Sequence, residues 1–103
     1  MKVSWSKRAA KSAQTTATYI YKEFGDKSSR KFLSELSRVS RLLEDNPYLG
    51  PTEPLLVNMK RQYRSIVVNR LNKIVYYIAG ETVRIVAVWD TRKEPKSQAK
   101  ILK

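Results

Sequence analysis

The apolar residues of this chain follow a helical period from residue 7 to residue 45 and a period of two from residue 62 onward. From about Lys27 to Asp45 they recur three and four positions apart, which puts on one stripe the side chains of Phe32, Leu33, Leu36, Val39, Leu42 and Leu43. After the turn-rich segment Asn46–Pro54 come three stretches rich in Val, Ile and Tyr: Gln62–Val68, Lys73–Ala79 and Thr82–Trp89. This change of period predicts an α+β fold.

Two further elements are expected before the long helical stripe. Lys2–Trp5 reads as a short opening strand, and Lys7–Phe24 as a helix with Ser6 as its N-cap and Gly25 at its end. The gap between the two helices is short, which favours an antiparallel hairpin. The predicted order is β-α-α-β-β-β, with the helical hairpin packed on one face of a small, mainly antiparallel sheet and the other face free. We expect one domain over residues 1–95 and a tail over residues 96–103.

The turns and the alternation of the strands add detail to this prediction. Gly80-Glu81 matches a two-residue hairpin turn that begins with glycine, and Asn69 to Asn72 reads as a slightly longer loop with Arg70 at its tip. Strict alternation in the last strand places on one face Val83, Ile85, Ala87 and Trp89, and on the other Arg84, Val86, Val88 and Asp90. Neither face is purely polar, so a partner is expected to cover part of the free face.

The chain is strongly basic, with 21 Lys and Arg against 9 Asp and Glu, a net charge of +12. Residues 58–103 hold 11 basic and 3 acidic residues, a net +8, whereas residues 1–57 hold 10 and 6, a net +4. Such an excess attracts polyanions. Nucleic acid, an acidic protein and an anionic membrane surface all fit, and the second half of the chain is expected to carry the interaction.

The absence of Cys and His excludes several kinds of site. Disulfides, zinc fingers, thiol nucleophiles and histidine-based acid–base pairs are impossible with this composition. No metal, cofactor or small-molecule ligand is expected. The longest apolar run, Ile74 to Ala79, is too short to span a bilayer, and the N-terminal residues lack a signal peptide, so we expect no membrane and a cytoplasmic protein.

Cations and aromatic rings gather near the predicted strand ends. Guanidinium and ammonium groups in a groove suit phosphate, and the candidates are Lys60, Arg61, Arg64, Lys73, Arg92 and Lys93. For each of them, a solvated surface cation is the simpler interpretation. Bases could stack on Tyr63, Tyr76, Tyr77 and Trp89, although strand aromatics more often belong to a core. Glu53 and Asp90 could act as general bases, but structural ion pairs are favoured for both.

Three segments together resemble the RelE/ParE superfamily of bacterial type II toxins. They are "VSWSKRAAKSAQTTATYIYKEFG", then "FLSELSRVSRLLEDNPYLGP", and last "YRSIVVNRLNKIVYYIAGETVRIVAVWDTRKEP". The likeness covers about Val3 to Pro95 and rests on the order and spacing of these segments more than on any single motif. It implies a growth-inhibiting toxin whose partner is a cognate antitoxin protein.

The resemblance implies one of two targets. RelE-like toxins cleave mRNA on the ribosome, and their pattern maps onto Arg64, Lys73 and Arg92 or Lys93 as catalytic cations, with Asp90 as the acid placed to act as a base. Nucleic acid would also contact Lys60, Arg61, Arg70 and Arg84. The match is incomplete, because Ile66 stands where that pattern has a second Lys and the segment "KSQAKILK" has no Tyr or His. ParE-like toxins inhibit DNA gyrase and need no catalytic set.

The residues and the resemblance together leave three functions open. The first is a toxin that cleaves mRNA with the ribosome, and the second is a toxin that binds gyrase without chemistry of its own. The third, a non-toxic basic module that binds nucleic acid, needs only the +12 charge. In the first two cases we expect an acidic or amphipathic antitoxin segment that folds on the toxin and covers apolar surface.

Overall fold

The computed structural model of the protein describes residues 1–92, so Lys93 and the predicted tail lie outside the described residues. Strand β1 (Lys2–Trp5) is followed by helices α1 (Lys7–Phe24) and α2 (Asp26–Asp45). After the connector, which contains the short 3-10 helix η1 (Pro54–Leu56), come β2 (Arg64–Val68), β3 (Asn72–Ala79) and β4 (Thr82–Asp90). The predicted order is confirmed, and the boundaries differ by two residues at most.

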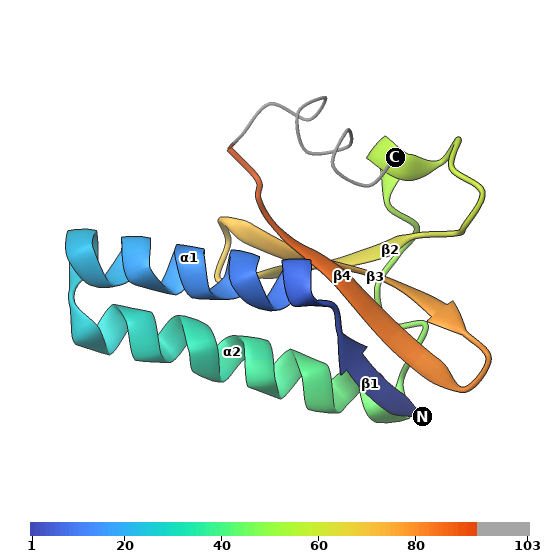
Figure 1. The fold of residues 1–103 in the computed structure, drawn as a ribbon, viewed down its shortest axis with the longest axis horizontal. Helices are drawn as coiled ribbons and strands as arrows, with labels where there is room; N and C mark the ends of the chain where they lie inside the picture. Colours follow the sequence, from blue (N-terminus) through green and yellow to red (C-terminus); the bar gives the residue numbers. More distant parts are fainter. Residues whose placement is uncertain (93–103) are drawn as a thin grey trace.

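The helical hairpin lies against one face of an open four-stranded sheet (Figure 1). The strand order is β1-β4-β3-β2, with β1 parallel to β4 and the other neighbours antiparallel. Because β1 pairs with the last strand, the first and last described elements lie side by side. The sheet is therefore mainly antiparallel, as predicted.

Small residues bring α1 and α2 close together. Ala9, Ala13 and Ala17 are buried along α1, and the hydroxyl of Ser29 on α2 donates a hydrogen bond to the Ala17 carbonyl at 2.9 Å. Ser6 caps α1 as predicted, since its Oγ accepts from the Ala9 N–H at 3.0 Å. Gly25 joins the helices with a φ of +94°, a conformation that residues with a Cβ rarely adopt.

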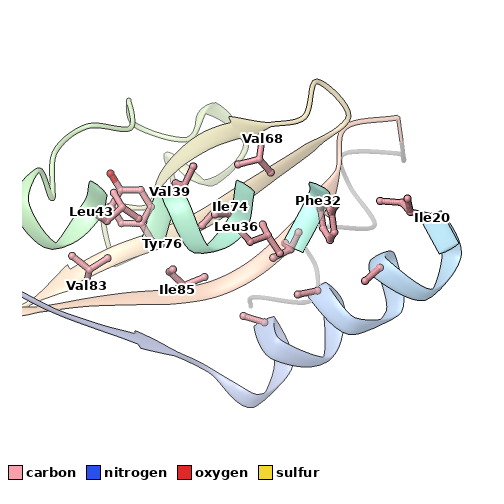
Figure 2. Packing of buried hydrophobic residues seen from close by; sticks show 14 residues of the cluster. Ile20, Phe32, Leu36, Val39, Leu43, Val68, Ile74, Tyr76, Val83 and Ile85 are labelled. Carbon is pink, nitrogen blue, oxygen red and sulfur yellow. The ribbon is translucent and has the colours of Figure 1, made fainter. Parts of the chain in front are cut away.

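The main core lies between the hairpin and the sheet (Figure 2). The α2 stripe contributes Phe32, Leu36, Val39 and Leu43, and the strands contribute Val68, Ile74, Tyr76, Val83, Ile85 and Val88. Leu33 and Leu42, predicted on the same stripe, are 41% and 37% exposed at its edges. The apolar stripe of α2 is thus narrower than the sequence predicted.

The prediction that the second face of the sheet is free was wrong. Leu56 and Tyr63 of the connector pack there on Val75, Ala87 and Trp89, and together these five residues form a second buried cluster. The connector folds back because η1 turns the chain immediately after it has run beside β2. The chain itself therefore covers much of the apolar part of this face, while Val67, opposite Lys73, stays 60% exposed.

A β-bulge also corrects the predicted faces of the last strand. Val75 pairs with Ala87, but the next residue, Tyr76, pairs with Ile85, so Val86 has no residue opposite it. The extra residue reverses the alternation beyond Ile85. Val88 consequently packs in the main core on the helix side, whereas Ala87 and Trp89 lie in the second cluster.

The connector is held to the sheet by Tyr76 and Arg64. The Tyr76 hydroxyl donates to the Pro47 carbonyl at 2.8 Å and accepts from the Gly50 N–H at 2.9 Å. The Arg64 guanidinium donates to the Gly50 carbonyl at 2.8 Å. Gly50 lies so close to β2 that a Cβ there would be 2.6 Å from the Ser65 carbonyl oxygen, which explains glycine at this position.

We expect Tyr76→Phe to lower the free energy of unfolding by about 1–3 kcal/mol, because the buried Gly50 N–H and Pro47 carbonyl lose their partner. Tyr77→Phe is the matched control, since no hydrogen bond to the Tyr77 hydroxyl exists within residues 1–92, and it should change stability by less than about 0.5 kcal/mol. Urea unfolding at pH 7 measures both. Equal values for the two variants would contradict the role assigned to Tyr76.

The same pair of variants has a predicted alkaline signature. Burial raises the pKa of Tyr76 above its ordinary value of 10.0, so the folded protein holds this phenol neutral after the unfolded chain has begun to ionise it. The stabilisation that neutral Tyr76 gives the folded protein is therefore complete below pH 10, and it is lost as the pH rises through the raised pKa of Tyr76 in the folded state. Tyr76→Phe should lose stability less steeply above pH 10 than Tyr77→Phe.

Candidate functional site

Lys73 forms a largely buried ion pair with Glu53 on the second face of the sheet. Its ammonium contacts Oε1 of Glu53, whose side chain is 0% exposed, while 17% of the Lys73 side chain is exposed. The same Glu53 oxygen accepts from the Ser65 hydroxyl at 3.1 Å, and Oε2 accepts from the Leu55 N–H at 2.7 Å. The structural ion pair favoured for Glu53 is confirmed, and Lys73 is its partner.

Trp89 lies beside this pair, directly opposite Lys73 in the β3–β4 ladder. The Lys73 ammonium is 5.3 Å from the centre of the indole ring, within the range of a cation–π interaction. Trp89 is only 4% exposed, and within residues 1–92 nothing accepts a hydrogen bond from its buried N–H. A base cannot reach this ring in the folded protein, and the same holds for Tyr76, which is 0% exposed.

Arg64 lies on the opposite face of the sheet from Lys73. It pairs with Tyr76 across β2 and β3, and its guanidinium binds the Gly50 carbonyl and stacks on the ring of Tyr48 at 4.9 Å. Lys73, by contrast, is directed toward the second cluster. The two strand cations that the sequence analysis grouped as catalytic are therefore not brought together.

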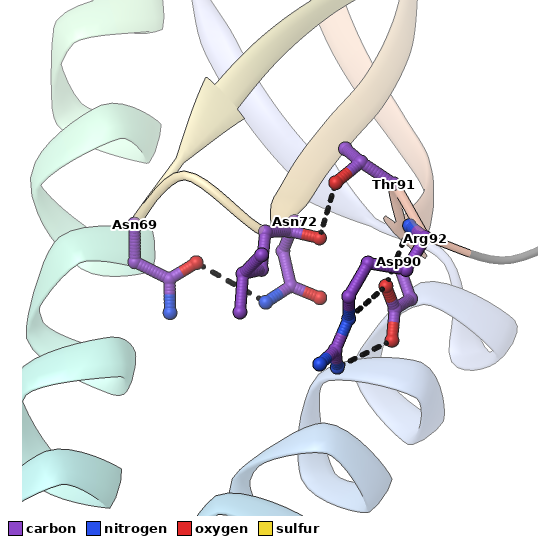
Figure 3. A network of polar contacts seen from close by, with 6 residues as sticks. Asn69, Asn72, Asp90, Thr91 and Arg92 are labelled. Carbon is purple, nitrogen blue, oxygen red and sulfur yellow. Dashed lines mark hydrogen bonds and ion pairs between the residues drawn. The ribbon is translucent and has the colours of Figure 1, made fainter.

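Asp90 and Arg92 form a third, separate group at the end of β4 (Figure 3). Two nitrogens of the Arg92 guanidinium donate to the Asp90 carboxylate at 3.1 and 3.0 Å. This hydrogen bonding, and then the charge of Asp90, raise the pKa of Arg92. The structural ion pair favoured for Asp90 is thus confirmed, and the Arg92 side chain remains 52% exposed.

The loop beside that pair is tightly held. Thr91 donates twice to the Leu71 carbonyl, from its N–H at 2.7 Å and its hydroxyl at 2.9 Å, and Asn72 donates to the side chain of Asn69. Arg70 stands at the exposed tip with a φ of +71°, which is unfavourable for a residue with a Cβ. The loop therefore presents one predicted nucleic-acid-binding cation to solvent on a backbone that its neighbours fix.

Arg61 and Arg84 both lie on the second face, on strands or connector next to Tyr77. The Arg61 guanidinium carbon is 4.3 Å from the centre of the Tyr77 ring, and Tyr63 meets the same ring edge-on with centroids 5.7 Å apart. Arg84 is the direct cross-strand neighbour of Tyr77, and its Nη1 donates to the Ser4 hydroxyl of β1 at 2.8 Å. Of the four cations predicted to bind nucleic acid, these two are both neighbours of Tyr77, whereas Arg70 is at its loop tip and Lys60 is exposed in the connector between η1 and β2.

A groove of about 470 Å³ lies between α1 and α2 and beside the end of β1. Its lining is mostly small or apolar and comes from Trp5, Ala10, Ala13, Gln14, Leu33, Leu36, Ser37, Ser40 and Arg41. The Trp5 indole donates to the Ser40 hydroxyl at 3.3 Å on its wall. This groove was not predicted from the sequence, although the alanines of α1 and the serines of α2 were the available signal.

This arrangement suits binding better than proton transfer. General acid–base catalysis needs a donor and an acceptor that both reach one substrate. Within residues 1–92, the acids nearest the cations, Glu53 and Asp90, already accept from Lys73 and Arg92. In the same part of the chain no three acidic side chains lie close enough to hold a metal ion, and no helix is long and apolar enough to cross a membrane.

Comparison with known proteins places this fold. The family model described as the ParE toxin of the type II toxin-antitoxin system, parDE, matches residues 3–95. A solved structure described as the chromosomal ParDE system from P. aeruginosa superposes with a TM-score of 0.74 at 14% identity, covering 89% of this chain and 97% of that one. The YoeB dimer from Staphylococcus aureus gives 0.57 at 18% identity, covering 84% and 92%. No curated protein sequence matches.

We expect Glu53→Gln to lower the free energy of unfolding by about 3 kcal/mol, because it leaves the Lys73 charge without its partner in a largely buried position. Glu35→Gln is the matched control. It breaks the exposed Glu35–Arg38 ion pair and should have a far smaller effect. Urea unfolding of both variants provides the comparison, and similar losses in the two would contradict a structural role for the buried pair.

Proposed function

Because the chain belongs to the family of ParE toxins of type II toxin–antitoxin systems, we propose that it arrests growth by binding DNA gyrase, with no bond-breaking step of its own. The observation that supports this most strongly is the separation of the candidate catalytic cations. Lys73 is paired with Glu53 on one face, Arg64 binds the Gly50 carbonyl on the other, and Arg92 is paired with Asp90 at the end of β4.

Binding to an acidic target requires a rigid, cationic surface, and the sheet provides one. The ion pairs and stacked arginines hold their side chains in fixed orientations before any target arrives, so less conformational entropy is lost on binding. The net charge of +12 speeds encounter with an acidic target at low salt. Neither feature requires a proton donor or acceptor.

We further propose a cognate antitoxin with an acidic, amphipathic segment as the physiological partner. The charge of the toxin favours acidic residues in that segment. Its apolar side would cover surface that this chain leaves exposed, and the hairpin groove with Leu33, 41% exposed, is one suitable place. The solved neighbour from P. aeruginosa is itself described as a ParDE system.

Ribosome-dependent mRNA cleavage is the second candidate. It is favoured by one specific observation, the exposed Arg92 beside Asp90, which is the carboxylate predicted to serve as the base. Arg64 and Lys73 would be the other catalytic cations in this proposal, but both would first have to leave their present partners.

The purified protein should block the supercoiling of relaxed plasmid by gyrase and ATP, because binding alone is enough for inhibition. Primer extension on mRNA from arrested cells should then give no new 5′ ends inside codons. Arg92→Gln serves as the discriminating variant, since it should still arrest growth if no RNA is cut. New 5′ ends that disappear in Arg92→Gln, together with uninhibited gyrase, would replace this proposal with RNA cleavage.

A further inference from the structure

We propose that the group formed by Ser4, Arg61, Tyr77 and Arg84, here called the Tyr77 ledge, binds the phosphate backbone of duplex DNA. The site stands on its own geometry. Its use during growth arrest rests on the proposed function, because gyrase holds a DNA duplex and a toxin on that enzyme would meet both protein and phosphate.

The ledge is built across three neighbouring strands and the connector. Ser4 on β1 lies opposite Arg84 on β4, and Arg84 lies opposite Tyr77 on β3. The flanking residues Val83 and Ile85 are fully buried in the main core, so the alternation of the strand turns Arg84 to the second face. Arg61 reaches the same ring from the connector at 4.3 Å. One guanidinium is thereby fixed over the Tyr77 ring on β3, and a second, that of Arg84, is held toward Ser4 on β1, so two cations lie across neighbouring strands of one face.

Neither arginine of the ledge has an acidic partner within residues 1–92. Arg30, Arg38 and Arg92 each contact a carboxylate within 4.0 Å, whereas Arg61 stacks on a ring and Arg84 donates to the neutral Ser4 hydroxyl. An arginine has five N–H donors, so most donors of both groups remain for a ligand. Uncompensated guanidinium groups with fixed planes match phosphate oxygens, which they can bind in pairs.

Phosphate fits the ledge better than an acidic protein does. Protein interfaces usually have an apolar centre, and the exposed large apolar side chains among residues 1–92 lie outside the ledge, for example Phe24, Tyr48 and Val57. The exposed Lys2, on the same side of β1 as Ser4, adds a further positive charge. The ledge therefore offers cations and hydrogen-bond donors, and none of its four residues is an exposed large apolar side chain.

The contacts of Tyr77 also favour the DNA backbone over stacked bases. Arg61 already covers one face of the ring, and Tyr63 meets it edge-on. Stacking of a base would need an open ring face. Contacts to phosphate carry no sequence information, so binding should be independent of DNA sequence and should depend strongly on salt.

The test is fluorescence anisotropy with the full-length protein and a labelled duplex of about 20 base pairs over a range of salt concentrations. Arg61→Gln/Arg84→Gln should weaken binding at least tenfold and reduce the slope of log affinity against log salt by about 2. Lys22→Gln/Lys27→Gln removes the same charge from exposed positions on the helical hairpin and should change affinity less than twofold. The DNA affinity of Arg61→Lys/Arg84→Lys should lie between that of the wild type and that of the Gln variant, since lysine keeps the charge but lacks the planar guanidinium group.

If Arg61→Gln/Arg84→Gln and Lys22→Gln/Lys27→Gln weaken DNA binding equally, the ledge is not the binding site, because net charge alone would then explain the affinity. So would binding that is unchanged by Arg61→Gln/Arg84→Gln, or a wild-type protein that binds poly-glutamate but not DNA. The supercoiling assay separates this inference from the proposed function. If the protein binds DNA through the ledge but does not inhibit gyrase, the DNA site is supported and the proposed function is contradicted. If the protein inhibits gyrase but the ledge variants bind DNA as the wild type does, the proposed function is supported and the DNA site is contradicted.

Discussion

The buried ion pair between Glu53 and Lys73 is the contact on which the second face of the sheet depends. Removing two charges from water is costly, and the cost is offset only when each charge has its full set of partners. Here one carboxylate accepts from Lys73 on β3, from Ser65 on β2 and from the N–H of Leu55 in η1. It therefore joins the connector to two strands and holds Leu56 over the second cluster.

The cations of the sheet fall into two groups, those bound to a carboxylate or a backbone carbonyl and those without an acidic partner among the described residues. The cations that a nuclease would need are engaged by Glu53, Gly50 and Asp90, and they stabilise the fold or its edges. The cations of the Tyr77 ledge have no acidic partner within residues 1–92 and sit on a rigid surface, where they can meet a polyanion without rearrangement. This division supports the proposed binding mechanism, because that mechanism does not require the engaged cations to leave their partners.

The sequence predicted the elements well because their signals are local. The helical and alternating periods, the Ser6 cap and the Gly80 turn each depend on a few adjacent residues. What it could not predict depends on distant contacts. Nothing in "VRIVAVWD" indicates that Val86 is the extra residue of a bulge, since only pairing with β3 decides this. Likewise, Glu53 and Lys73 are 20 residues apart, so their pairing and the separation of Lys73 from Arg64 appear only after the connector has folded.

The double variant Glu53→Gln/Lys73→Met tests the central claim most directly. Gln can still accept from the Leu55 N–H, and Met fills the space of the lysine stem, so the charges are removed while the packing is kept. The measurement is growth arrest on induction, with circular dichroism confirming that the variant is folded. If Lys73 is structural, the folded variant arrests growth as the wild type does. A folded variant that leaves growth unaffected would show that the Lys73 charge acts on the target, and would contradict the account.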